Sequence, residues 1–163
     1  MLPNALICWL CGLSLIGLSI AMHAIGLLLI TLMLSSLRAR MQGVPRSHRA
    51  RRRTAVLVLG ITGITLAALH AVHSGIWAIA YVAVGALDTY SDAVLYSIDS
   101  MTTRGASGLM LAEEWRLMGA LEAADGMLLF GISTAFLFAV LQRTWPLLEG
   151  VVDGRSSLGD RRA

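Results

Sequence analysis

The chain has 163 residues, of which 56% are hydrophobic and only 14% are charged, and its mean hydropathy is +0.72. Soluble domains carry about 25% charged residues, so this composition excludes an ordinary water-soluble protein and indicates one that a lipid bilayer surrounds. The net charge of +3 is a local feature, because seven of the thirteen arginines lie between Arg38 and Arg53. The cluster lies between two apolar segments, as the positive-inside rule predicts, and we therefore predict no nucleic-acid partner.

The first apolar segment runs from Ala5 to Leu37 and contains no Asp, Glu, Lys or Arg. About 20 apolar residues are enough for a helix to cross the hydrocarbon core, so residues 1–37 are predicted to form a membrane-spanning helix that packs peripherally. Cys8 and Cys11 have the Cys-x-x-Cys spacing of a redox or metal motif, but such a pair is a weak signal. We interpret both as small buried apolar residues and predict neither a metal site nor a cofactor.

Two further apolar segments, Thr54 to Leu87 and Leu117 to Leu141, are also long enough to cross the membrane. The arginine-rich connection at residues 38–53 and the arginines of the C-terminal tail at 143–163 place both regions in the cytoplasm under the positive-inside rule. With three crossings, the N-terminus then lies outside. The sequence therefore predicts an all-α, multi-pass membrane protein with three transmembrane helices.

The connection between the second and third apolar segments, Asp88 to Arg116, is too short and too polar to cross the membrane twice. Within it, Ser91 to Thr103 has the pattern of a short amphipathic helix. The apolar residues at helical spacing are Val94, Leu95, Ile98 and Met101. The following stretch consists of Thr102, Thr103, Arg104, Gly105, Ala106, Ser107 and Gly108. Its glycines allow backbone conformations that a helix cannot use, so the pattern predicts a re-entrant pore helix and a filter-like loop.

This region resembles the pore region of bacterial two-helix potassium channels, in which an ALYFS pore helix is followed by TTLGYGD and then by WR and GALEA. The matching residues are Ala93 to Ser97, Thr102, Thr103 and Gly105, Trp115 and Arg116, Gly119 to Glu122, Gly126 to Gly131, and Ser133 to Ala135. The resemblance covers Ile76 to Gln142, a little under half of the chain. It implies that residues 54–142 form a helix, pore loop and helix unit. It also implies an ion-channel pore subunit of a homo-tetramer in a bacterial inner membrane, with permeant ions and lipid as its partners.

The loop departs from the family at the filter itself. Ala106 stands at the tyrosine position, and Ser107 stands at the second glycine unless Gly108 takes its place by a shift of one residue. Because filter carbonyl groups replace the hydration shell of the ion, this change predicts passive movement of cations with altered selectivity rather than strict potassium selectivity.

Arg104 allows three interpretations. Facing the pore, it would form a cationic ring that repels cations. Facing away, it would need a buried partner, for which Asp99 is the candidate that would support the filter, with Glu113 and Glu114 as rivals. In the third interpretation, its guanidinium group reaches the outer water interface.

Two acidic residues lie within the third apolar segment, where such residues indicate function. Asp125 is the deeper one and is predicted to line the cavity, where carboxylates from several subunits would concentrate cations. The alternative is a hydrogen bond to a neighbouring helix or to the pore helix, and this structural interpretation is preferred for Glu122. Gly126 and Gly131 on the same segment are candidate hinges, or else they permit close helix packing.

His70 and His73 lie three residues apart on the second segment, and His23 lies on the first. Their spacing suits a metal or a proton-sensitive contact, but interhelical hydrogen bonding is the default interpretation. No motif of nucleophilic catalysis, phosphate binding or dinucleotide binding is present, so we predict no enzyme. The alternative to an ion channel is a channel-like scaffold or sensor that does not conduct.

Overall fold

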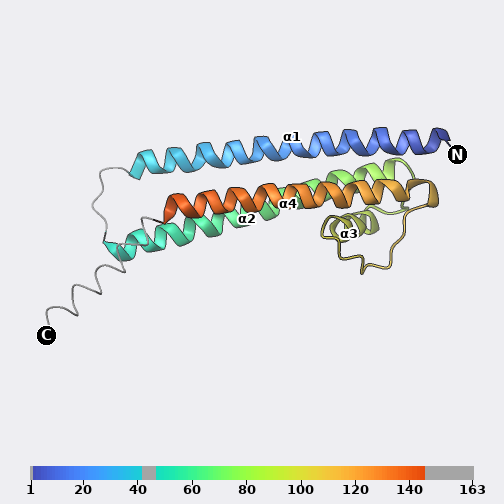
Figure 1. The fold of residues 1–163 in the computed structure, drawn as a ribbon. Coiled ribbons are helices and arrows are strands. Elements are labelled where there is room, and N and C mark those ends of the chain that lie inside the picture. Colours follow the sequence, from blue (N-terminus) through green and yellow to red (C-terminus); the bar gives the residue numbers. More distant parts are fainter. Residues whose placement is uncertain (1, 42–46, 146–163) are drawn as a thin grey trace, which may run out of the picture. The chain divides into compact units, whose positions relative to one another are not determined.

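The computed structural model describes residues 2–41 and 47–145, and these residues are helical apart from short connections. The elements are α1 (Leu2–Met41), α2 (His48–Ala83), α3 (Tyr90–Met101), a 3₁₀ turn (Glu113–Trp115) and α4 (Arg116–Thr144) (Figure 1). Three stretches are long and apolar enough to cross a membrane, namely Leu6–Leu37, Arg49–Ala83 and Glu113–Thr144. The prediction of three helices of spanning length is confirmed, and they suggest a multi-pass membrane protein.

The helices extend further into the arginine-rich segment than the sequence predicted. Residues 38–53 were expected to form a loop, but α1 continues to Met41 and α2 begins at His48. Ser47 stabilises this start, because its carbonyl oxygen accepts from the amide of Arg51 at 3.1 Å and its hydroxyl oxygen faces the amide of Ala50 at 3.4 Å. Arginine is also a good helix former. Residues 42–46 of the expected loop, and 146–163 of the expected tail, lie outside the described residues.

The chain forms two compact units, one from residues 1–26 with 67–132 and the other from 27–66 with 133–163. Within the described part of the second unit, the buried residues include Ile30, Ala55, Thr62, Leu66 and Val140. The first unit holds α3, the loop after it and the main apolar core. That core centres on Trp77, Ala78, Tyr81, Ala93 and Met118, each completely buried. The candidate site therefore belongs to the first unit.

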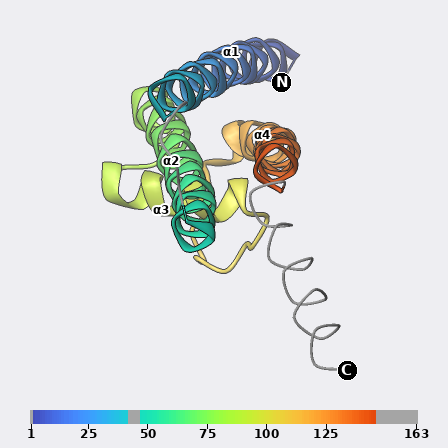
Figure 2. The ribbon, with the colours of Figure 1, turned by 90° about the vertical axis from the view of Figure 1, so that its left-hand side faces the viewer.

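Helix α3 lies against the second half of α2 and the first half of α4, and it runs across these helices rather than along them (Figures 1 and 2). Its start is fixed by Thr89, whose hydroxyl oxygen accepts from the amide of Asp92 at 3.1 Å. This is an N-cap, with an acidic residue in the first turn where it suits the helix dipole. The amphipathic helix predicted at Ser91 to Thr103 is thus confirmed, with bounds shifted by one or two residues.

Helix α3 buries polar as well as apolar side chains. Its buried residues are Ala93, Ser97, Asp99 and Met101, whereas Leu95 and Ile98 of the expected apolar stripe are 45% and 46% exposed. The reason is that polar side chains of α3 have partners inside the unit. Ser100, for example, donates a hydrogen bond to the carbonyl oxygen of Gly119 at 2.9 Å. In an apolar solvent such as lipid, polar groups must be satisfied within the protein, and apolar side chains can face outward.

The backbones of α3 and α4 approach each other closely at Gly126, which predicts the effect of adding one methyl group there. A Cβ atom on Gly126 would lie 2.7 Å from the Cα atom of Met101 and 2.9 Å from its carbonyl carbon. Because backbone atoms cannot move aside cheaply, we expect Gly126→Ala to lower the free energy of unfolding by about 1 to 3 kcal/mol.

The measurement is thermal or denaturant unfolding of the purified protein in detergent. Gly131→Ala is the matched control on the same helix, because a Cβ atom there would have nothing within 4 Å. We expect this control to leave the stability unchanged or slightly raised. An equal loss of stability in both variants would contradict the close packing of Gly126.

Candidate functional site

The loop after α3 is fastened to the helix by the carboxylate of Asp99. Its Oδ1 atom lies 2.6 Å from Nε of Arg104, and its Oδ2 atom accepts from the backbone amide of Ser107 at 2.7 Å. The backbone amide of Arg104 also donates to the carbonyl oxygen of Asp99 at 3.0 Å. The predicted pair of Asp99 and Arg104 is confirmed, and the rival partners Glu113 and Glu114 are exposed residues of the 3₁₀ turn.

The same contacts keep the Asp99 carboxyl group ionised. Side-chain hydrogen bonding to Arg104 and the amide of Ser107 lower the pKa of Asp99 from 3.8 to about 2. The carboxylate is buried, with 3% of its side chain exposed, whereas the Arg104 side chain is 61% exposed. The pair therefore combines a buried anion with an exposed cation, as in the interpretation in which Arg104 has a buried partner.

The backbone of the loop visits the left-handed region at three positions, with φ of 54° at Thr103, 61° at Gly105 and 72° at Gly108. Glycine adopts this region without strain, which explains the two glycines of the predicted filter-like loop. Neither Ala106 nor Ser107 has a positive φ, so the second left-handed glycine position falls at Gly108, as in the interpretation with a shift of one residue. The strained residue is Thr103, which the sequence did not identify.

The Glu122 carboxyl group joins three helices at the centre of the first unit. Its Oε2 atom accepts a hydrogen bond from the Tyr81 hydroxyl group of α2 at 2.7 Å, and its Oε1 atom accepts from the Ser97 hydroxyl group of α3. All three residues are completely buried. The structural interpretation of Glu122 is therefore confirmed, whereas its partners Tyr81 and Ser97 were missed. The sequence did contain one signal for such partners, because a carboxyl group inside a membrane-spanning helix requires hydrogen-bond donors from the rest of the protein.

Asp125 lies one turn further along α4 and is also completely buried. Its Oδ2 atom accepts from Nε1 of Trp77 at 3.0 Å, which is the expected alternative of a hydrogen bond to a neighbouring helix. A carboxyl group that its own chain covers completely does not line a cavity between chains. The structure therefore places the Asp125 carboxyl group between α4 and α2, and not on the surface of a pore as predicted. Gly126 fits the close-packing alternative, and Gly131 is exposed.

Three histidines gather between α1 and α2. The ring centroid of His23 lies 5.3 Å from that of His70 and 5.4 Å from that of His73, and the His70 ring stacks on Phe130 at 4.1 Å. The structure thus brings together all three histidines that the sequence singled out. Among the described residues, no group of His, Cys, Asp and Glu has the arrangement of a metal site.

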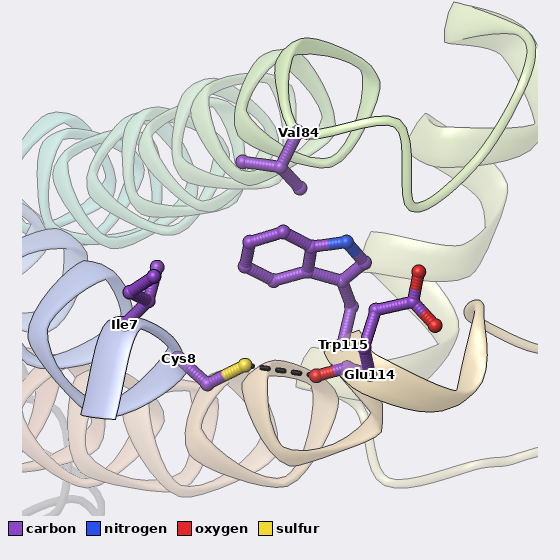
Figure 3. A pocket seen from close by; sticks show the side chains of 5 residues that line it. All are labelled: Ile7, Cys8, Val84, Glu114 and Trp115. Atoms are coloured by element: carbon purple, nitrogen blue, oxygen red, sulfur yellow. Dashed lines mark hydrogen bonds between the residues drawn. The ribbon is translucent and has the colours of Figure 1, made fainter. Parts of the chain in front are cut away.

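A small pocket of the first unit lies just before the start of α4 (Figure 3). It has a volume of about 280 Å³ and is lined by Ile7, Cys8, Val84, Glu114 and Trp115. The Cys8 thiol donates to the carbonyl oxygen of Glu114 at 2.9 Å, and both Cys8 and Cys11 are free thiols. Cys8 is buried, so it behaves as the small core residue that the sequence predicted, with one added contact between α1 and the 3₁₀ turn before α4.

Comparison with known proteins gives no match: neither a family model, nor a curated protein, nor a solved structure is similar to the chain at a significant level. The class of protein that the fold defines is an all-helical protein with three helices of membrane-spanning length. The candidate functional site is the loop of Thr102 to Gly108, which Asp99 holds against α3. The buried carboxyl groups of Glu122 and Asp125 lie on α4 in the same unit.

The low pKa of Asp99 predicts how the loop responds to acid. Because the folded-state pKa of about 2 lies below the ordinary 3.8, the carboxylate stabilises the folded loop above about pH 4. This contribution is lost as the pH falls towards about 2. We expect Arg104→Gln to raise the pKa of Asp99 towards 3.8, as measured by carboxyl-carbon NMR titration. Arg116→Gln, which removes an exposed arginine outside the loop, should leave that pKa unchanged, and an equal effect of both variants would contradict the specific pair.

The hydrogen bond between Tyr81 and Glu122 predicts that removing a single oxygen atom lowers the stability of the fold. Tyr81→Phe removes the hydroxyl group that donates to Oε2 and leaves this buried acceptor unpaired, so we expect a loss of about 1 to 3 kcal/mol in the free energy of unfolding. Tyr90→Phe is the control, because Tyr90 is 52% exposed at the start of α3. Unfolding in detergent measures both, and equal stability of Tyr81→Phe and the parent chain would rule out this hydrogen bond as a support of the fold.

Proposed function

We propose that the chain is a pore subunit of a homo-oligomeric ion channel, which mediates passive movement of cations across a membrane. The observation that carries the proposal is the position of α3. A short helix between two helices of spanning length packs beside them and ends well inside their length, and a loop leads from there back to the start of α4. This arrangement supports a re-entrant pore helix with a filter-like loop.

The contacts of Met101, the last residue of α3, support a re-entrant position of the loop. Its sulfur atom lies 3.3 Å from the Ser74 hydroxyl group of α2, and its backbone packs against Gly126 of α4. Ser74 precedes the end of α2 by nine residues, and Gly126 follows the start of α4 by ten. At 1.5 Å per residue, Met101 therefore lies roughly 14 Å from the end of α2 and roughly 14 Å from the start of α4, measured along each helix. Non-helical backbone at such a depth in a membrane is tolerated where it lines a water-filled cavity.

The loop has features that suit an ion path. Thr102 to Gly108 are exposed except for the half-buried Ser107, so the backbone carbonyl groups of this stretch are available to water, to ions or to a second copy of the chain. Asp99 fixes the loop from behind through Arg104 and Ser107. Because the Arg104 charge is paired with that of Asp99, the loop does not present an uncompensated cation, and this lowers the electrostatic barrier that Arg104 would otherwise set against cations. Potassium selectivity is not part of the proposal, because Ala106 supplies no aromatic brace.

An ion path needs more than one copy of the chain, since one loop cannot enclose a pore. The exposed apolar residues of α3 and α4 suit contact with further copies or with lipid. They include Leu95, Ile98, Met127, Leu128 and Phe130. The number four, the bacterial inner membrane and the orientation with the N-terminus outside and the C-terminus in the cytoplasm rest on the resemblance to potassium channels and on the positive-inside rule.

A second candidate function is a channel-like scaffold or sensor that does not conduct. The observation that favours it is the Arg104 side chain, which is 61% exposed although it is paired. In a ring of several chains, these guanidinium groups would stand close together and repel cations.

Ion flux through the purified protein in liposomes separates the two candidates, with potassium, sodium and chloride gradients tested in turn. For a cation pore we expect potassium and sodium flux in the parent chain and at least equal flux in Arg104→Leu, because removing the exposed guanidinium group lowers the barrier for cations. Arg116→Leu is the control for the loss of an exposed arginine elsewhere. Chloride flux in the parent chain that is lost in Arg104→Leu would contradict a cation path. The absence of any ion flux in both the parent chain and Arg104→Leu would favour the non-conducting function.

A further inference from the structure

The arginines at the start of α2 have no acidic partner in the part of the chain that the structure describes. They are Arg49, Arg51, Arg52 and Arg53, and all four side chains are exposed. None of them forms a salt bridge with a described residue, and the sequence contains no Asp or Glu before Asp88. These arginines therefore present a concentrated positive charge at one end of a helix of spanning length.

The helix itself adds to this positive charge. The N-terminus of a helix carries a partial positive charge, which negatively charged groups stabilise, yet the first turn of α2 contains no acidic side chain. Arg49 and Arg53 are also four residues apart, and like charges at this spacing repel each other along a helix. Binding of an anion would relieve both conflicts at once.

Three of the four arginines precede an exposed apolar face of the same helix. Residues four apart lie one above the other along a helix, so α2 has two neighbouring rows that begin with arginine and continue with exposed apolar residues or glycine. Positive charge followed by an apolar surface is complementary to an anionic phospholipid, in which a phosphate group is joined to acyl chains. One row consists of Arg49, Arg53, Leu57 and Ile61, and the other consists of Arg52, Val56, Gly60 and Ile64.

The length of α2 suits a position of the arginines at the level of the headgroups. The candidate span Arg49–Ala83 has 35 residues, and at 1.5 Å per residue it is roughly 52 Å long. The hydrocarbon core of a bilayer is about 30 Å thick, and the headgroup layers bring the total to about 40 to 45 Å. With its apolar part inside the core, the first turn of this span therefore reaches into the headgroup layer, where phosphate groups lie.

We infer that Arg49, Arg52 and Arg53 bind the phosphate group of an anionic phospholipid, whose acyl chains lie along the exposed apolar residues of the same two rows. The arginines supply charge-assisted hydrogen bonds to the phosphate oxygens, and the apolar side chains contact the acyl chains. A second copy of the protein does not suit this face, because parallel copies at the same depth would bring the two sets of arginines together. The inference requires the chain to lie in a membrane but does not depend on ion conduction.

Arg51 provides a matched control on the same turn of α2. It precedes Ala55 by four residues, and Ala55 is buried, so Arg51 is aligned with the packed side of the helix and not with the two rows. Arg51→Gln and Arg53→Gln therefore remove the same charge from different sides of one helix.

The test is native mass spectrometry of the full chain in detergent, titrated with phosphatidylglycerol and with zwitterionic phosphatidylcholine. We expect phosphatidylglycerol to bind more tightly. Arg53→Gln should weaken phosphatidylglycerol binding by about fivefold, whereas Arg51→Gln should leave its dissociation constant almost unchanged. Glycerophosphoglycerol, which is the headgroup without acyl chains, and inorganic phosphate should each bind far more weakly than the lipid. Should Arg53→Gln fail to fold, Arg52→Gln of the neighbouring row replaces it.

Equal dissociation constants for the two lipids would overturn the inference, as would equal weakening by Arg51→Gln and Arg53→Gln. Binding of the headgroup or of inorganic phosphate as tightly as the lipid would assign the arginines to a small phosphate ligand. Displacement of phosphatidylglycerol by an equal concentration of a polyglutamate peptide would assign them to an acidic protein. Either of the last two results would also overturn the lipid as the ligand.

Discussion

The carboxyl group of Glu122 is the constraint on which the first unit depends. It is completely buried, and it takes one hydrogen bond from Tyr81 of α2 and one from Ser97 of α3. Removing a carboxyl group from water is costly unless donors replace the water. Because the two donors come from different helices, they can do so only when α2, α3 and α4 are packed together. The cost of burying Glu122 therefore selects one arrangement of the three helices, which apolar contacts in lipid would specify less sharply.

This constraint explains why α3 turns its polar side inward. Ser97 must reach Glu122, and the buried carboxylate of Asp99, two residues later, then holds the loop through Arg104 and Ser107. Leu95 and Ile98 are left on the outer side, where lipid or another apolar surface accepts them at no cost. The position of the loop thus follows from a contact in the middle of α3 rather than from the residues of the loop alone.

The sequence predicted features that depend on neighbouring residues and missed features that depend on distant ones. Hydropathy identified the three long helices, and the pair of Asp99 and Arg104 was accessible because only five residues separate them. The partners of Glu122 lie 41 and 25 residues away, and no local pattern marks Tyr81 or Ser97 as donors. The buried polar face of α3 was not predicted, because the rule that apolar residues face the core holds for a protein surrounded by water and weakens in lipid.

Helices α2 and α4 both contact the residue at which the proposed pore loop begins. His73 is followed on α2 by Ser74, and Asp125 is followed on α4 by Gly126. Both following residues contact Met101, at which α3 ends and the loop begins. The contact with Gly126 is between backbones and leaves no space for even a methyl group, so a displacement of α4 at Asp125 moves Met101 as well. The base of the proposed pore loop is therefore coupled to α4 by direct contact, without an intermediate chain of contacts.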